Sequence, residues 1–188
     1  MSDAAWQQKP LRAKSVPDVL TPAQCETVKH DALAIGLAKV GALEAEGQRR
    51  SKIWAREAVR LSSIPERAWL FELILAKSEV INHENWRFAL SGIEDLRVVR
   101  YKPMQRARWH FDTHVGSNRK IICVVNLSSP ETYWHGGLQV KGRHENKDVA
   151  SLQGSGTWFP AYMEHRAKAP WRGERFSLVA ILTGPTWV

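Results

Sequence analysis

The spacing of apolar residues changes near residue 92 of this chain of 188 residues. Before that point, apolar residues recur at every third or fourth position, which is the period of an amphipathic helix. After it, short runs rich in β-branched residues alternate with turn residues, which is typical of strands. The pattern therefore predicts helices in the first half of the chain and a β-rich second half.

Two helices are expected in the first half. One begins at Thr21, because Thr21 can cap a helix, Pro22 suits its first position and Gln24 completes a capping box. The other begins near Pro65, and residues 51–54 between them are interpreted as a short strand. The expected buried faces are Cys25, Val28, Ala32 and Ile35 in the first helix, and Trp69, Leu70, Leu73, Ile74, Val80 and Ile81 in the second.

Five strands are expected in the second half, separated by stretches of Gly, Ser, Asn and Pro. They are residues 96–101, 120–127, 138–141, 156–159 and 175–182. Many short strands at this spacing indicate a mainly β fold, either a barrel or a double sheet, with N-terminal helices. We predict a single domain, 1–188, with a flexible tail at about 1–15, helical support at 16–91 and a β-barrel core at 92–188.

The formal net charge of +8 restricts the partners only slightly. A cluster of basic residues between positions 97 and 120 can attract nucleic acid, acidic peptides or small carboxylates. Its members are Arg97, Arg100, Lys102, Arg106, Arg108, Arg119 and Lys120. No nucleic-acid-binding motif accompanies this basic cluster, so we interpret it as a solvated surface and do not expect nucleic acid as a partner.

Cysteine usage and hydropathy indicate the compartment. Cys25 and Cys123 fit no zinc pattern and no disulfide framework, which favours a reducing environment. Residues 1–20 contain no apolar signal-peptide core, and no apolar stretch reaches the length of a membrane span. We therefore expect a cytoplasmic protein without a membrane partner. The sequence indicates no oligomeric state.

The segment from Trp109 to His114 carries the candidate metal chemistry. His110 and Asp112 are two residues apart, so on a strand both side chains would face the same way. With His165 as the third ligand they would form a facial triad of two histidines and one carboxylate, which leaves three coordination positions open for an oxygenase. His114 has the same parity and remains an alternative ligand or a neighbour of the site. His135 and His144, expected in loops, are not excluded either.

A candidate anion site follows ten residues after His165. Arg175 and Ser177 share one face of an expected strand, so a guanidinium and a hydroxyl lie side by side. A guanidinium binds a carboxylate through two hydrogen bonds, and the hydroxyl adds another donor. This arrangement suits the distal carboxylate of 2-oxoglutarate.

From Arg100 to Pro185 the sequence resembles the prolyl 4-hydroxylase-like branch of the Fe(II)/2-oxoglutarate dioxygenases, which includes the bacterial PKHD-type hydroxylases. The matching pieces are Arg100-Tyr101, Trp109-His110-Phe111-Asp112, Arg119-Lys120, Leu127-Ser128-Ser129-Pro130 with Tyr133, Gly136-Gly137, Phe159-Pro160, His165-Arg166, Arg172-Gly173-Glu174-Arg175, Ser177 and Gly184-Pro185. The resemblance implies a double-stranded β-helix, the jelly-roll fold of cupins, with supporting N-terminal helices.

The resemblance also implies the cofactors and the reaction. Fe(II) would be held by His110, Asp112 and His165, and 2-oxoglutarate by Arg175 with Ser177 and Tyr101. O2 would be the second cosubstrate, and ascorbate is a candidate reductant. The reaction would be hydroxylation of an unactivated C–H bond in a prolyl or other peptidyl residue, a free amino acid or a small natural product.

Three positions depart from the family pattern. Many relatives carry a Gly and a second Tyr between Tyr101 and His110, where this chain has Met104 and Ala107. If that second Tyr helps to bind 2-oxoglutarate, another residue must replace it. The acidic residue that often follows the paired glycines is Leu138 here.

Substrate contacts are expected from four residues. Trp134 is expected in a loop between Ser129 and Gly136. Arg106 and Arg108 would suit an acidic substrate, and His114 belongs to the segment that carries the candidate metal ligands.

Two other functions are considered. One is a nucleic-acid demethylase of the same superfamily, which usually has a second Arg where this chain has Ile181. The other is a catalytically silent cupin-like binding protein.

Overall fold

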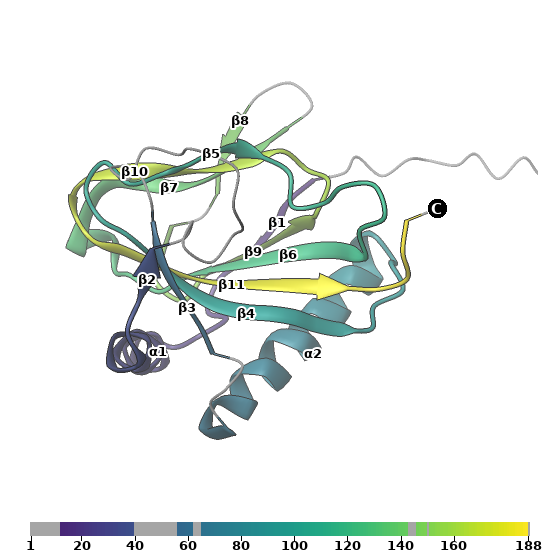
Figure 1. Ribbon diagram of the computed structural model, residues 1–188, viewed down its shortest axis with the longest axis horizontal. Helices are drawn as coiled ribbons and strands as arrows, with labels where there is room; N and C mark the ends of the chain where they lie inside the picture. Colours follow the sequence, from purple (N-terminus) through teal and green to yellow (C-terminus); the bar gives the residue numbers. More distant parts are fainter. Residues whose placement is uncertain (1–11, 40–55, 62–64, 143–145, 150, 188) are drawn as a thin grey trace, which may run out of the picture.

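The computed structural model describes residues 12–39, 56–61, 65–142, 146–149 and 151–187. Two antiparallel sheets face each other, and two helices cover the outer face of the larger sheet (Figure 1). Neither helix in these described residues combines the length and the apolar character needed to cross a membrane. The mainly β fold with supporting helices, predicted from the apolar spacing, is confirmed.

The first helix, α1 (Pro22–Ile35), begins where its local signals predict. The Thr21 hydroxyl accepts from the Gln24 backbone N–H at 3.2 Å, and the Gln24 side chain accepts from the Thr21 N–H at 2.9 Å. Cys25, Val28 and Ala32 are buried, as expected. Ile35 is 46% exposed, so its assignment to the buried face was wrong. It belongs to the last turn of α1, where Leu33 is exposed as well.

The second helix, α2 (Ala68–Asn85), follows a short 3-10 turn, η2 (Pro65–Arg67). Leu70, Ile74 and Ile81 are buried as predicted, but Val80 is 60% exposed. The buried stripe passes through Ser78 instead, because residues 70, 74, 78 and 81 share one helix face. The Ser78 hydroxyl can occupy this stripe because it donates to the Ile74 carbonyl at 2.6 Å and accepts from the Trp158 indole N–H at 2.8 Å.

The larger sheet has the strand order β1-β9-β6-β11-β4-β3-β2. Its strands are β1 (Lys14–Val16), β2 (Ala38–Lys39), β3 (Glu57–Arg60), β4 (Gly92–Tyr101), β6 (Arg119–Asn126), β9 (Gly156–Pro160) and β11 (Arg175–Thr183). The smaller sheet has the order β5-β10-β7-β8. Its strands are β5 (Ala107–His110), β10 (His165–Gly173), β7 (Tyr133–Lys141) and β8 (Asn146–Asp148), and a 3-10 turn, η3 (Pro130–Thr132), precedes β7.

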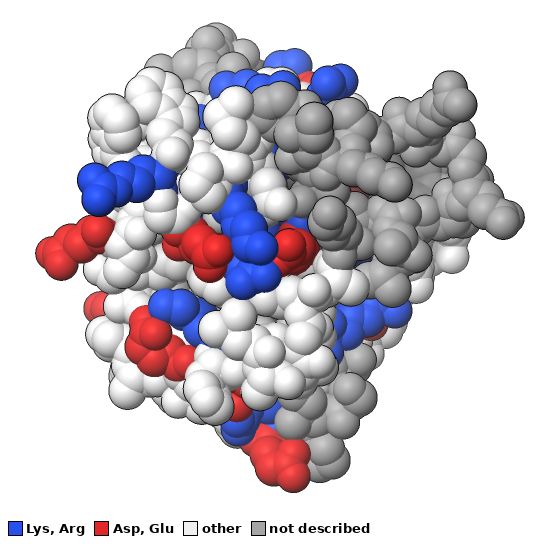
Figure 2. Space-filling model, turned by 60° about the vertical axis from the view of Figure 1, so that its left-hand side comes forward, with Lys and Arg blue, Asp and Glu red and all other residues white. Residues whose placement is uncertain are grey.

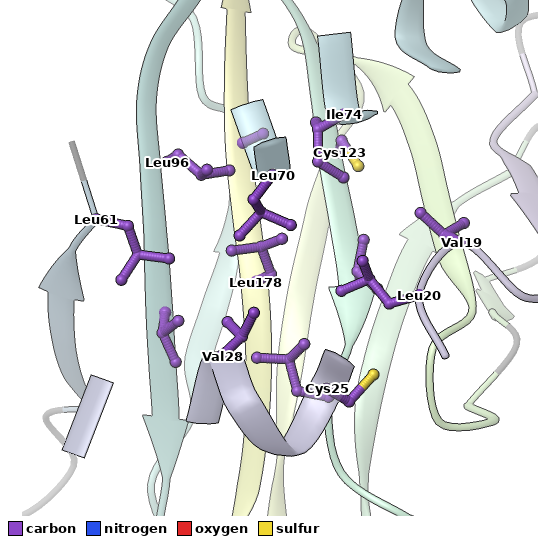
Figure 3. Close-up of a cluster of buried hydrophobic side chains, with 14 of the residues drawn as sticks. Val19, Leu20, Cys25, Val28, Leu61, Leu70, Ile74, Leu96, Cys123 and Leu178 are labelled. Atoms are coloured by element: carbon purple, nitrogen blue, oxygen red, sulfur yellow. The ribbon is translucent and has the colours of Figure 1, made fainter. Parts of the chain in front are cut away.

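The central strands of the larger sheet alternate their side chains between two cores. On β11, Leu178 and Leu182 face the helices, whereas Val179 and Ile181 face the smaller sheet. Figure 3 shows the helix side, where Leu70 and Ile74 of α2 and Val28 of α1 meet strand residues. The inner side contains Ile122 and Phe159, packed with Leu138 of the smaller sheet. This alternation turns Arg175 and Ser177 into the space between the sheets, as the sequence predicted.

Several boundaries differ from the sequence prediction. The strand β1 begins at Lys14, close to the end expected for the tail at about 1–15, and Lys14–Val16 pair with Gly156–Trp158 of β9. The support region 16–91 contains β2 and β3 as well as helices, and both extend the larger sheet. The strand predicted at 51–54 lies outside the described residues. The strand β10 was not predicted, because its Ala, Lys and Pro residues give no strand pattern.

Candidate active site

The two candidate histidines face each other across one rung of the smaller sheet. His165, the first residue of β10, is paired with His110, the last residue of β5. Their ring centroids are 4.3 Å apart, and the Phe159 ring lies 4.7 Å from that of His165. The antiparallel register, and not any local motif, therefore brings together residues 55 positions apart in the sequence.

A bulge in β5 helps to aim His110 inward. Between two paired rungs, β10 advances two residues, from His165 to Ala167, while β5 covers three, from Ala107 to His110. Strict alternation would place Ala107 and His110 on opposite faces. The extra residue places both toward the larger sheet, since Ala107 packs with Tyr101 and the His110 ring meets His165.

Asp112 completes the group from a loop. The sequence placed His110 and Asp112 on one strand, but β5 ends at His110, so that premise was wrong. The Asp112 N–H instead donates to the Ala161 carbonyl at 3.0 Å, and the Ala161 N–H donates to Lys120 on β6 at 2.9 Å. The carboxylate lies 3.6 Å from His110 Nε2 and 3.4 Å from His165 Nε2.

The hydrogen bonds of both histidines prepare them for a metal. His110 Nδ1 lies 2.7 Å from the Arg108 carbonyl oxygen, and His165 Nδ1 lies 3.0 Å from that of Met163. A carbonyl only accepts, so each Nδ1 carries a proton, and in the neutral form of the ring Nε2 is left free to bind a metal. All three candidate ligand atoms lie within 4.8 Å of one another. The group therefore fits a metal ion held on one face by two histidines and one carboxylate.

The protonation state of the group suits the same purpose. Burial, and then the neighbouring His165, lowers the pKa of His110, so the ring is neutral at pH 7. Burial would raise the pKa of Asp112, but the hydrogen bond and charge of His165, with His110 and Arg119, outweigh it and lower the pKa overall. A neutral imidazole and an ionised carboxylate are the forms that bind metals.

The other candidate histidines lie elsewhere. In the part of the chain that the structure describes, the single group of three potential metal ligands is His110, Asp112 and His165. The structure places His114 exposed in the loop after Asp112 and outside that group. His135 stacks on Trp171 with ring centroids 3.9 Å apart. His144 lies outside the described residues.

Arg175 is a buried cation whose hydrogen bonding is incomplete. It is only 3% exposed, and its Nε has no hydrogen-bond partner among the described residues. The same holds for the hydroxyl of Ser177, which is 1% exposed. Burying a charge without a partner is costly, so such a guanidinium is expected to face a bound anion. The two residues thus fit a carboxylate ligand.

Arg175 borders a cavity between the sheets. The cavity is small, about 10 Å³, and its walls include Val124, Asn126, Leu138, Thr157 and Arg175. Tyr101 is the partner of Arg175 in the β4–β11 register, and the guanidinium lies 5.6 Å from the centre of its ring. Polar groups for an anion therefore gather at this end of the space between the sheets.

A continuous set of side chains links the Arg175 cavity to the histidine rung. The next rung below His110 and His165 is formed by Ala107 and Ala167. Both alanines pack in one buried cluster with Tyr101, which borders Arg175. Both side chains are small, so this rung adds little bulk between the metal group and Arg175.

Ala107 stands where many relatives carry a second Tyr, so this position offers no polar side chain to a ligand. Two polar residues, Asn126 and Thr157, line the same cavity as Arg175. The Asn126 amide nitrogen donates to the carbonyls of Ser128 at 2.8 Å and Ser151 at 2.6 Å, so its orientation is fixed. Its buried carbonyl oxygen has no partner among the described residues.

Comparison with known protein families identifies the β-core. Residues 96–182 match the family model described as the 2OG-Fe(II) oxygenase superfamily. This segment contains the histidine rung, Asp112 and Arg175. Residues 96–182 belong to the 2OG-Fe(II) oxygenase superfamily. The chain is therefore an enzyme of the class that needs Fe(II) and 2-oxoglutarate.

Solved structures support the fold of this oxygenase over nearly the whole chain. A Pseudomonas putida prolyl-4-hydroxylase is similar with a TM-score of 0.74 and 14% identity, over 91% of this chain and 92% of that one. The viral collagen prolyl hydroxylase of Paramecium Bursaria Chlorella virus-1, in its 2OG complex, gives 0.68 and 16%, over 92% and 96%. A Trichoplax adhaerens prolyl hydroxylase, in complex with a hypoxia inducible factor peptide fragment, gives 0.68 and 11%, over 91% and 83%. Comparison with curated protein sequences found no match.

The fold of these relatives is the double-stranded β-helix, so the fold expected from the sequence resemblance is confirmed for this oxygenase. The expected cofactors, Fe(II) and 2-oxoglutarate, are confirmed by the family. The specific substrate is not defined by these likenesses.

The structure places Trp134 away from the histidine rung. Trp134 was expected in a loop, but it lies in β7 opposite Arg172, whereas Val140 of β7 lies opposite His165. Six residues of strand separate the two levels, or about 20 Å. Gly136 and Gly137, expected as a turn, lie within the same strand with positive φ. Gly137 pairs with Lys168 of β10, so the two glycines lie inside a strand and the prediction of a turn there was wrong.

The basic cluster carries much less free charge than the sequence suggests. Five of its seven members are neutralised or buried: Arg97 contacts Asp95, Arg100 and Lys102 contact Glu57, Arg119 contacts Glu94, and Lys120 is buried. On the face drawn in Figure 2, acidic side chains accordingly lie beside the basic ones. Arg106 and Arg108 are exposed on either side of Ala107. This distribution agrees with the interpretation as a solvated surface.

Sequence reasoning missed two charged neighbours of the metal group. The Arg119 guanidinium lies 3.5 Å from the Asp112 carbonyl while it binds Glu94 at 2.7 Å. Arg56, just before β3, adds a weaker influence to burial and His165 in lowering the pKa of His110. Arg119 was part of the family pattern, but no role was predicted for it. Arg56 gave no sequence signal, because its proximity to His110 depends on the pairing of β3 with β4.

Proposed function

We propose that this oxygenase hydroxylates an unactivated C–H bond, with Fe(II) held by His110, Asp112 and His165. 2-Oxoglutarate is anchored through its distal carboxylate by Arg175, with Ser177 and Tyr101 beside it. The observation that carries the proposal is the pairing of a preformed ligand group with a buried, incompletely bonded guanidinium in one space between the sheets. A binding protein without chemistry would not need both.

Each residue has a defined task in this proposal. The Arg108 and Met163 carbonyls fix the histidine tautomers, so that both Nε2 atoms point to the metal. Arg175 neutralises and orients the cosubstrate, while the apolar residues Ile122, Val179 and Ile181 exclude water around it. When bound, Fe(II) with 2-oxoglutarate and O2 supplies the oxidising chemistry that this superfamily uses.

A prolyl residue of a peptide is the proposed substrate, and a free amino acid or small natural product is the alternative. Structural similarity to three prolyl hydroxylases, one of them with a bound peptide, supports the first choice. The exposed side of the metal group also favours a large substrate, because the His110 side chain is 35% exposed while that of His165 is 6% exposed. Substrate can therefore approach from the His110 side.

The deciding experiment is an anaerobic absorbance titration of the metal-free protein with Fe(II) and then 2-oxoglutarate. A visible charge-transfer band that is lost in His165→Ala and weakened in Arg175→Ala would establish the metal ligands and the anchor together. Absence of the band in the wild-type protein would contradict the proposal. Succinate release with prolyl peptides and free amino acids would then identify the substrate class.

We further propose that Arg106 and Arg108 contact an acidic substrate, with Trp134 and His114 as additional contacts. Both arginines are exposed and lie four and two residues before His110, the last residue of β5, which supports the first part. Replacing both with Ala should raise the KM for substrate and leave iron affinity unchanged. An unchanged KM would reject the role of these arginines.

A cytoplasmic location is also proposed. Cys25 and Cys123 are free and buried, which suits a reducing compartment. Burial raises the pKa of the Cys25 thiol to about 11, so this thiol is held in its unreactive form. Neither cysteine is therefore proposed to take part in the reaction.

A further inference from the structure

The loop that carries Asp112 is held from outside by the segment that follows β11. Three consecutive carbonyls at the base of this loop accept hydrogen bonds from that segment. The Ser117 carbonyl accepts from the Trp187 N–H at 3.2 Å, and the Asn118 carbonyl accepts from the Gly184 N–H at 2.9 Å. The Arg119 carbonyl accepts from the Trp187 indole N–H at 3.0 Å. Trp187 thus provides two of the three donors.

The indole ring of Trp187 also contacts the second support of Asp112. Its centroid lies 5.9 Å from that of Tyr162, the residue after Ala161, whose carbonyl holds the Asp112 N–H. Phe88 packs edge-on to the same indole at 5.5 Å. On the remaining face, Lys120 Nζ lies 3.4 Å from the ring centre. Lys120 is the residue whose carbonyl binds the Ala161 N–H, so the ring contacts both segments that hold Asp112.

The loop itself has few other supports. Phe111 is 56% exposed and Val115 fully exposed, so little apolar burial fixes the loop. Within it, Ser117 N–H donates to the His114 carbonyl at 3.0 Å, which closes one turn. A carboxylate on such a loop keeps its position only if the loop base is fixed, because metal ligands require placement within a fraction of an ångström.

We propose that Trp187 is a positioning residue of the metal site: it fixes the loop base at Ser117–Arg119 and thereby holds the Asp112 carboxylate opposite His110 and His165. This inference rests on the proposed metal ligands and adds a residue that contacts none of them. This role predicts a different result from general packing: loss of Trp187 should lower metal affinity, whereas loss of a packing residue should lower only the stability of the fold.

The test compares Trp187→Ala and Trp187→Phe with Trp86→Ala in the full chain. Trp86 is a matched control, since it is partly buried and stacks on Phe88 at 6.5 Å in the same aromatic cluster. Among the described residues, no hydrogen bond or ring contact joins Trp86 to residues 111–119. Co(II) alone is the probe, titrated by visible absorbance, and the melting temperature of each metal-free protein is measured in parallel.

Loss of a residue that orients a metal ligand typically weakens metal binding about 10- to 100-fold, which is the expected effect of Trp187→Ala. Trp187→Phe keeps an aromatic ring but loses the indole N–H that donates to the Arg119 carbonyl, so Co(II) affinity is expected to fall about fivefold. Trp86→Ala should lower the melting temperature and leave Co(II) affinity within about twofold of the wild type. Equal affinity in Trp187→Ala and wild type, or an equal loss in Trp86→Ala, would overturn the inference.

Hydrogen exchange separates this inference from the proposed function. In the metal-free protein, amides of residues 112–119 should exchange faster in Trp187→Ala than in Trp86→Ala. Unchanged exchange would overturn the role of Trp187. Failure of the wild-type protein to bind Co(II) would instead contradict the metal site, while the exchange rates would still decide whether Trp187 fixes the loop.

Discussion

Replacing Arg175 with Met should have opposite effects on the cosubstrate-free protein and on 2-oxoglutarate binding. Arg175 is 3% exposed and its Nε is without a partner in the described part of the chain, so the empty site holds a poorly compensated charge. Replacing a buried ionic group by an apolar residue of similar volume is often stabilising by about 1–4 kcal/mol. The lost contact with the Tyr101 ring, at 5.6 Å, offsets about 0.5–2 kcal/mol of that gain.

The expected net gain in unfolding free energy is therefore about 1–2 kcal/mol. For a chain of this length, about 2–4 °C of melting temperature corresponds to each kcal/mol, so the metal-free variant should melt about 2–8 °C higher than the wild type. Binding should change in the opposite direction. Two charge-assisted hydrogen bonds contribute about 1.5–3 kcal/mol each, so 2-oxoglutarate affinity should fall about 100-fold or more.

Thermal unfolding with Co(II) and a series of 2-oxoglutarate concentrations measures both effects. A ligand at 100 times its Kd stabilises the wild type by about 2.7 kcal/mol, and Arg175→Met should lose most of this shift. Arg172→Met, which removes an exposed arginine three residues earlier, should change neither quantity. A variant at Arg175 that melts lower when ligand-free, or that is still stabilised by 2-oxoglutarate, would refute the reasoning.

Further predictions concern the metal group and the fold. His165→Ala should abolish Co(II) binding in an absorbance titration, whereas His114→Ala should leave it intact; equal effects would reject the assigned ligands. Protons compete with metal for imidazole, so affinity should fall as pH decreases, and the lowered pKa of His110 should move that fall below about pH 6.5; titrations from pH 8 to 5 measure it. Glu57→Gln should cost about 1–3 kcal/mol in urea unfolding at pH 7. Burial acts to raise the pKa of Glu57, but the hydrogen bonds and charges of Arg100 and Lys102 outweigh it, so the pKa is lowered overall. The stabilisation by Glu57 is therefore fully present above the ordinary pKa of a glutamate and is lost as the pH falls through the lowered pKa of the folded protein. A stability difference between Glu57→Gln and the wild type that does not change with pH would contradict this prediction.

Local signals predicted the elements whose stability is local. The start of α1 was predicted because the capping box involves only residues 21–24, whose hydrogen bonds close within one turn. The strands β6 and β11 were predicted because their β-branched residues are buried on both faces, where such side chains pack well. The alternation along β11 also predicted that Arg175 and Ser177 point the same way.

Elements stabilised by distant partners were missed or displaced. β10 carries Ala, Lys and Pro, and it is a strand because β5 and β7 pair with it on both sides. Val80 was assigned to the core because of its apolarity, but Trp158 on β9 supplies a hydrogen bond that makes Ser78 the better residue for the buried stripe. These choices depend on residues far away in the sequence, 80 positions in the case of Ser78 and Trp158, which no local pattern can contain.

The sequence by itself determined the chemistry available to this protein: the identity of the two histidines, the carboxylate and the arginine, and the family to which their order points. The tertiary structure decided their geometry. The β5–β10 register placed His110 opposite His165, a bulge turned His110 inward, and the bond to Ala161 positioned Asp112 from a loop. The physical reason is that strand register and loop position arise from pairing between distant segments, whereas side-chain chemistry belongs to each residue alone.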